Sequence, residues 1–104
     1  MPRKTKSQVI SFSGTGDNTV VAGAQNSQIN VFGILFTVDA ATNITFKSGA
    51  ISLSGPLVFT GNGSSMTLEL NMDEPYFYCP TNTAFIMNQS GTAQVSGVAY
   101  YTSG

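Results

Sequence analysis

Residues 29–39 read INVFGILFTVD, and this run is the longest strand that the pattern of the chain indicates. Its β-branched and aromatic residues are typical of strands. Side chains alternate between the two faces of a strand, so the order of residues assigns each side chain to a face. One face would hold Phe32, Ile34, Phe36 and Val38, and the other would hold Ile29, Val31 and Leu35. We therefore predict a strand that is apolar on both faces.

A strand of a two-layer sandwich normally carries polar residues on its solvent face. The second apolar face of residues 29–39 therefore needs a cover, which is either a loop of the same chain or a neighbouring subunit. The C-terminal stretch 93–102 has the same character, because apolar and aromatic residues again fall on both faces. If a neighbouring subunit is the cover, the residues at the interface are Val31, Leu35, Val98 and Tyr100.

Strand signals of the same kind recur along the rest of the chain, about every 8–12 residues, and none of the segments between them has a helical period. The expected strands are 8–12, 19–22, 29–39, 42–48, 57–60, 66–71, 76–79, 84–88 and 93–102, with a short segment around Ile51 and Leu53. Turn residues separate many of them, for example at 14–18 and 61–63. This spacing predicts an all-β fold: a single-domain antiparallel β-sandwich, jelly-roll-like, with eight or nine short strands.

The composition leaves few groups for catalysis. Of 104 residues only 9% are charged, there is no His, and Cys79 is the single cysteine. Without His, a Ser-His-Asp triad, a Cys-His pair and a His-containing zinc site are excluded. Cys79 lies in an apolar stretch, which predicts a buried and inert thiol. We therefore expect a protein that is not an enzyme, with no catalytic residues, no metal ligands and no cofactor.

Two groups of residues leave alternatives open. The carboxylates of Asp73 and Glu74, with Glu69 nearby, could hold calcium in a loop, or they could form a solvated turn ahead of Pro75. The aromatic residues of 76–78 and 100–101 could form a stacking platform for sugars or bases, or they could belong to the core or to an interface.

Basic residues are concentrated at the start of the chain. Arg3, Lys4 and Lys6 lie within the first six positions, and the only other basic residue is Lys47. We expect a flexible basic arm at 1–6 and the sandwich domain at 7–104. The arm either contacts an acidic surface or is an ordinary frayed terminus, and three basic residues are too few for firm binding to nucleic acid. No apolar stretch has the length of a signal peptide or of a membrane span, so we expect synthesis in the cytoplasm and no membrane partner.

Several local stretches, in their order and spacing, resemble the small β-sandwich virion proteins of tailed bacteriophages, of the head decoration or cement type. These stretches are GDNTVVA (16–22), FKSG (46–49), ISLSGPL (51–57), NTAFIMNQSG (82–91) and VSGVAY (95–100). Together they extend over most of residues 16–101. The basic start at Arg3, Lys4 and Lys6 is a departure from many such proteins.

The resemblance implies a structural role in a virion. Such a protein would bind the major capsid protein on the outside of the head and stabilise the shell, as a homo-oligomer and most often as a trimer. The implied location is the capsid surface, after synthesis in the host cytoplasm, with Arg3, Lys4 and Lys6 as a capsid-contact arm. The alternative is a host-surface or glycan-binding module of a tail or head fibre, which would use exposed Tyr and Asn side chains.

Overall fold

The computed structural model describes residues 5–103, and every regular element in that range is a strand. The ten strands, in chain order, are β1 (Lys6–Phe12), β2 (Gly16–Val21), β3 (Ile29–Val38), β4 (Thr42–Ser48), β5 (Ile51–Ser52), β6 (Leu57–Phe59), β7 (Ser65–Leu68), β8 (Phe77–Cys79), β9 (Phe85–Gln89) and β10 (Val95–Ser103). The all-β prediction is confirmed. The turn predicted at 14–18 is too long, because β2 already begins at Gly16.

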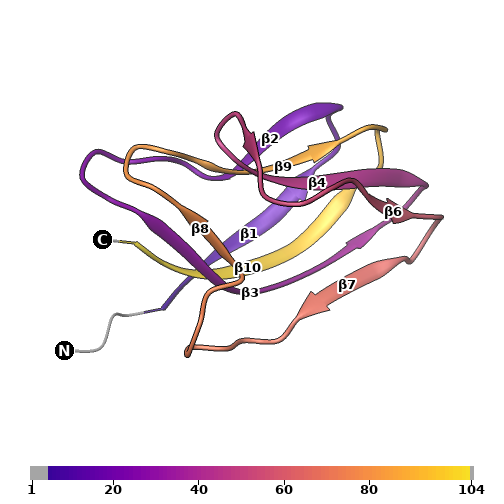
Figure 1. Cartoon of the computed structure of the whole chain (residues 1–104). Coiled ribbons are helices and arrows are strands. Elements are labelled where there is room, and N and C mark those ends of the chain that lie inside the picture. The colour runs from indigo at the N-terminus through magenta and orange to yellow at the C-terminus, as the bar shows by residue number, and fades with distance from the viewer. Residues whose placement is uncertain (1–4, 104) are drawn as a thin grey trace.

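The strands form two antiparallel five-stranded sheets that face each other as two layers (Figure 1). The first, which we name the β10 sheet, has the order β1-β10-β3-β7, and β8 also pairs with β3. The second, the β9 sheet, has the order β2-β9-β4-β5, and β6 also pairs with β4. The chain passes repeatedly between the layers, so each sheet combines strands from both ends of the sequence. This winding is jelly-roll-like, as the sequence predicts.

The strand count exceeds the predicted eight or nine because the short segment around Ile51 and Leu53 contributes a strand of its own, β5. One position in each sheet is divided between two short strands. β5 and β6 share the edge of β4, and β7 and β8 share the edge of β3. Between β5 and β6, the N–H groups of Leu53 and Ser54 donate to the carbonyl of Phe46 at 2.7 and 3.3 Å. The N–H of Phe46 in turn donates to the Ser54 hydroxyl at 3.1 Å. The hydroxyl thus keeps β4 hydrogen-bonded where its partner strand is interrupted.

A β-bulge in β3 changes which side chains face the core. The register between β10 and β3 pairs Tyr100 with Gly33 and Tyr101 with Val31, so Phe32 is an extra residue on β3. An extra residue reverses the alternation of faces beyond it. Ile29 and Val31 are therefore buried in the same core as Ile34, Phe36 and Val38. The sequence prediction that Ile29 and Val31 lie on the opposite face of the strand from the other three is wrong. It assumed an unbroken alternation.

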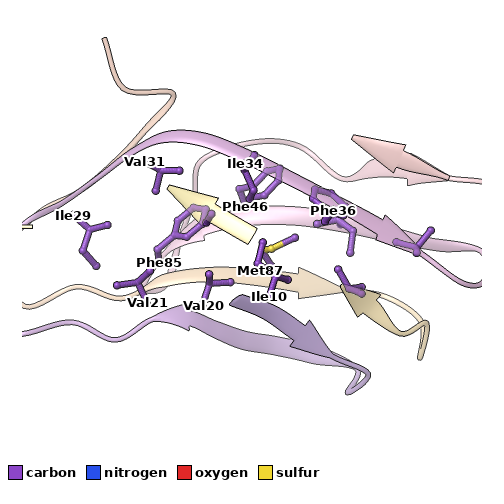
Figure 2. Close-up of a cluster of buried hydrophobic side chains, with 14 of the residues drawn as sticks. Ile10, Val20, Val21, Ile29, Val31, Ile34, Phe36, Phe46, Phe85 and Met87 are labelled. Carbon is purple, nitrogen blue, oxygen red and sulfur yellow. The ribbon is translucent and has the colours of Figure 1, made fainter. Parts of the chain in front are cut away.

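The core between the sheets is centred on aromatic rings. Phe46 stacks on Phe77 with ring centroids 4.6 Å apart and on Phe85 at 6.0 Å, and it meets Phe36 edge-on at 6.2 Å. Figure 2 shows the rings of Phe36, Phe46 and Phe85 among aliphatic side chains that come from both layers. Each fully buried Phe stabilises the fold by roughly 1.5–3 kcal/mol relative to an exposed one. The core is thus filled by the protein's own side chains.

A buried amide ties three loops together at one end of the sandwich. The Gln89 Nε2 donates to the carbonyls of Gly14 and Ala93, both at 3.0 Å, and its Oε1 accepts from the Thr42 hydroxyl at 2.9 Å. The Thr42 hydroxyl also accepts from the N–H of Gly91 at 3.2 Å. Because every polar atom in this buried cluster has a partner, it stabilises the loop ends at little desolvation cost.

Candidate functional site

The outer face of the β10 sheet carries a row of apolar side chains. In the strand register Val9 of β1 lies opposite Val98 of β10, and Val98 lies opposite Leu35 of β3. Val9 is 71% exposed, Leu35 is 42% exposed, and Val98 is half-buried. Directly opposite residues on neighbouring strands have side chains in contact, so these three form one continuous strip, which we name the outer row.

The surroundings of the outer row are polar but uncharged. Ser7 and Ser11 flank Val9 on the same face of β1, and Ser96 flanks Val98 on β10. On β3, Thr37 lies beyond Leu35 and is exposed. An apolar strip with an uncharged border resembles the centre of a protein interface, where charged residues are depleted. This face is therefore suited to contact with another protein surface.

Part of the same face is covered by the chain itself. The segment 69–76, between β7 and β8, is tied to β3 where the N–H of Asn71 donates to the Phe32 carbonyl at 2.9 Å. A Cβ on Gly33, which lies opposite Tyr100, would be 3.1 Å from the Cα of Leu70. The segment also reaches the start of β1, where the Thr5 hydroxyl donates to the sulfur of Met72 at 3.6 Å. A loop of the same chain thus covers the Tyr100 end and leaves the outer row open.

The predicted interface residues therefore divide into three situations. Leu35 and Val98 lie on the open part of the outer face, as the sequence suggests. Tyr100 is on the same face but half-buried near the covering segment. Val31 is 0% exposed and packs in the chain's own core, because of the bulge at Phe32. A side chain with no exposed surface has none to offer a second subunit, so Val31 is removed from the interface.

Val9 belongs to the outer row but was missed by the sequence reasoning. The alternation in 8–12 places Ile10 and Phe12 on one face of the strand. The same alternation leaves Val9 as the one apolar residue on the opposite face of that strand. That signal was available, but a single exposed valine has no meaning until the register places it beside Val98.

The basic arm is only partly within the described residues. Lys6 is the first residue of β1, and its ammonium donates to the Ser103 hydroxyl of β10 at 2.9 Å. The sandwich thus begins one residue earlier than the predicted boundary at position 7. Arg3 and Lys4 lie outside the described residues.

The outer face of the β9 sheet carries an ion pair, and the exposed Val58 of β6 lies on the same face. The Lys47 ammonium lies 3.0 Å from Oδ1 of Asp17, and the Asn88 amide donates to the same oxygen at 2.7 Å. The hydrogen bonds from Asn88 and then from Lys47 hold the pKa of the Asp17 carboxyl below its usual value. These residues come from β2, β4 and β9, so the ion pair links three neighbouring strands of this face.

The remaining sequence-derived candidates are distributed as follows. Asp73 and Glu74 are exposed in the covering segment. Tyr76 and Tyr78 are 40% and 47% exposed, and their hydroxyls donate to the Glu69 carbonyl at 2.7 Å and to Gln28 at 3.0 Å. Cys79 is fully buried, and burial raises the pKa of its thiol, so the prediction of a buried thiol is confirmed.

Within residues 5–103 the structure contains no pocket and no group of three or more His, Cys, Asp or Glu placed to hold a metal. No helix in that range is long and apolar enough to cross a membrane. Comparisons of the chain with protein families, with curated proteins and with solved structures found no match.

Proposed function

We propose that this protein is a structural component of a phage virion, a decoration protein that binds the outer surface of the head and stabilises the shell. The observation that carries the proposal is the outer row of Val9, Val98 and Leu35, an open apolar strip on the outer face of the β10 sheet. Open apolar strips of this kind mark protein contacts. The resemblance of residues 16–101 to head decoration proteins supplies the identity of the partner, the major capsid protein.

A decoration protein stabilises the shell through many binding contacts and needs no catalysed reaction. Each copy that binds only the assembled shell stabilises that state by mass action, and many copies act together. A rigid sandwich supports this role, because little conformational entropy is lost when a preformed surface binds. In this proposal Leu35 and Val98 contact a neighbouring protein of the shell, and Arg3, Lys4 and Lys6 approach an acidic part of it. The resemblance implies a trimer on the capsid surface.

The proposal is tested by binding to heads of the phage whose genome encodes the chain. Purified protein is mixed with heads that lack it, and bound protein is measured after gradient sedimentation. Wild type is expected to sediment with the heads, and Leu35→Lys is expected to lose at least about tenfold in affinity, since it places a charge in an apolar contact. Val58→Lys is the matched control, because Val58 is 70% exposed on β6 of the other sheet.

A wild-type protein that does not sediment with heads would contradict the decoration role. Equal loss in Leu35→Lys and Val58→Lys would contradict the assignment of the contact to the outer row. Circular dichroism of both variants establishes that each remains folded.

One observation favours the alternative of a glycan-binding module on a tail or head fibre. The exposed rings of Tyr76 and Tyr78 are held in place through their hydroxyls, as a platform for sugar stacking requires. A glycan array separates the two functions. Binding that is lost in Tyr78→Ala would support the fibre module, and a protein that binds heads and no glycan would support decoration.

A further inference from the structure

The outer edge of β1 has no partner strand among the described residues. β1 pairs only with β10, so its other edge presents backbone N–H and C=O groups along Lys6–Phe12. The Val9 carbonyl accepts a hydrogen bond from the exposed side-chain amide of Gln8 at 3.3 Å, so it is within reach of a donor other than β10. Unpaired strand edges of this length are templates for the addition of another strand.

The residues of this edge lack the features by which proteins block strand addition. Charged residues and proline are the usual blocks on an edge strand. The stretch Ser7–Phe12 contains neither, and its only charged neighbour is Lys6 at the end of the strand. β5 and β6 differ, because the interruption at 53–56, with Pro56, breaks their edge. β2, the edge strand on the other side of the β9 sheet, carries Asp17 and a register shift between Thr19 and Val21. Among the described edge strands, β1 is thus the long one without an interruption.

On the face that carries the outer row, the residues of β1 read the same in both directions: Ser7, Val9 and Ser11. Val9 is the centre of the seven residues Lys6–Phe12. If a second copy added its β1 antiparallel about a two-fold axis, Val9 would lie opposite its own equivalent, and Ser7 would lie opposite Ser11. Side chains directly opposite each other point to the same face, so on the outer face valine would meet valine and serine would meet serine. On the inner face Gln8 would lie opposite Ile10, and Lys6 opposite Phe12. A self-complementary edge is what a two-fold interface needs.

We propose that the partner of this edge is a second copy of the same chain, joined by antiparallel pairing of β1 with β1 about Val9. The two β10 sheets then form one continuous sheet. Because Val9 ends the outer row, the pairing joins two outer rows into a single apolar strip that runs Leu35, Val98, Val9, Val9, Val98, Leu35. This inference stands apart from the decoration role, because it depends only on the register and on the free edge. It makes the homo-oligomer a two-fold dimer in place of the trimer that the resemblance implies.

Sedimentation equilibrium of the full chain tests the association. Wild type is expected to have twice the mass of one chain, and Val9→Lys is expected to weaken association at least about tenfold, because two like charges would face each other across the new pair. Val58→Lys is the matched control, since it changes an equally exposed valine on another edge strand and should leave association unchanged. A monomeric wild type, or the same mass in Val9→Lys as in wild type, would overturn the proposal.

Disulfide trapping tests the register independently of affinity. Opposite residues have Cα atoms about 4.5–5.5 Å apart, a separation that a disulfide spans. Val9→Cys should therefore form a covalent dimer on mild oxidation. Ser11→Cys should not, because its equivalent would lie four residues along the strand, about 13 Å away.

A mixture of Ser7→Cys with Ser11→Cys should cross-link as Val9→Cys does, since these positions face each other in the proposed pair. Wild type, whose Cys79 is buried, is the blank. Cross-linking of Ser11→Cys alone would overturn the register.

Discussion

Gly97 of β10 and Leu35 of β3 approach each other so closely that no side chain fits between the two strands. A Cβ on Gly97 would overlap the Leu35 carbonyl oxygen and would lie 2.6 Å from the Cα of Phe36. Both obstacles are backbone atoms, which yield much less than the end of a flexible side chain. This contact fixes the spacing of the two central strands of the β10 sheet, on which the outer row depends.

Gly97→Ala should therefore destabilise the protein severely. We expect a loss of at least about 3 kcal/mol in the free energy of unfolding, measured by urea denaturation, because the strands must separate to admit the methyl group. Gly61→Ala is the control, since a Cβ there meets nothing within 4 Å, and its stability should be unchanged or slightly raised. Equal stability of the two variants would contradict the close approach.

Two buried threonines should respond in opposite directions to replacement by valine. The Thr102 hydroxyl is buried and has no hydrogen-bond partner among the described residues, so Thr102→Val should raise the free energy of unfolding by about 1 kcal/mol. The Thr42 hydroxyl bonds both Gln89 and the N–H of Gly91, so Thr42→Val should cost about 2–4 kcal/mol. Urea denaturation of both variants measures this contrast, and a loss of stability in Thr102→Val would contradict it.

The Asp17 carboxylate should make stability depend on acid. Its pKa is lowered in the folded protein by Asn88 and Lys47, so its contribution is present above the unfolded pKa of about 3.9 and is lost as the pH falls through the lower folded pKa. Unfolding measured from pH 7 to pH 2 should show wild type more stable than Asp17→Asn at neutral pH. The difference should shrink below about pH 4. A difference that stays constant over this range would exclude the ion pair as its source.

The Cys79 thiol should be inert while the protein is folded. It is fully buried, and the burial that raises its pKa also disfavours the reactive thiolate. Labelling with a thiol reagent at pH 8 should be complete in urea, and without urea it should be at least about a hundredfold slower. Rapid labelling of the native protein would mean that β8 opens readily.

Most of the fold follows from residue pattern, because each strand carries its own apolar alternation and its own turn residues. β3, β4 and β10 lie within a few residues of their predicted bounds for this reason. Local pattern has no signal for the bulge at Phe32, since it arises from pairing with β10. It also cannot specify which strand lies beside which, so the division of the edges of β3 and β4 appears only in three dimensions.

The candidate site was predictable only in part. Leu35 and Val98 stood out as apolar residues on the second face of long strands, and the structure places them side by side. An unbroken alternation places Val31 on the same face as Leu35, but the bulge at Phe32 turns Val31 into the core. Val9 can be assigned to the outer row only when the register of β1 with β10 is known. The cover over Tyr100 can be recognised only from the path of segment 69–76. In each case the missing information was a contact between residues far apart in sequence.

The most direct test of the account is a cryo-electron microscopy map of heads decorated with this protein. The account predicts density for the sandwich on the outer capsid surface, with Leu35 and Val98 buried against a neighbouring protein. Heads that carry no such density, or bound copies whose outer row faces solvent, would contradict it.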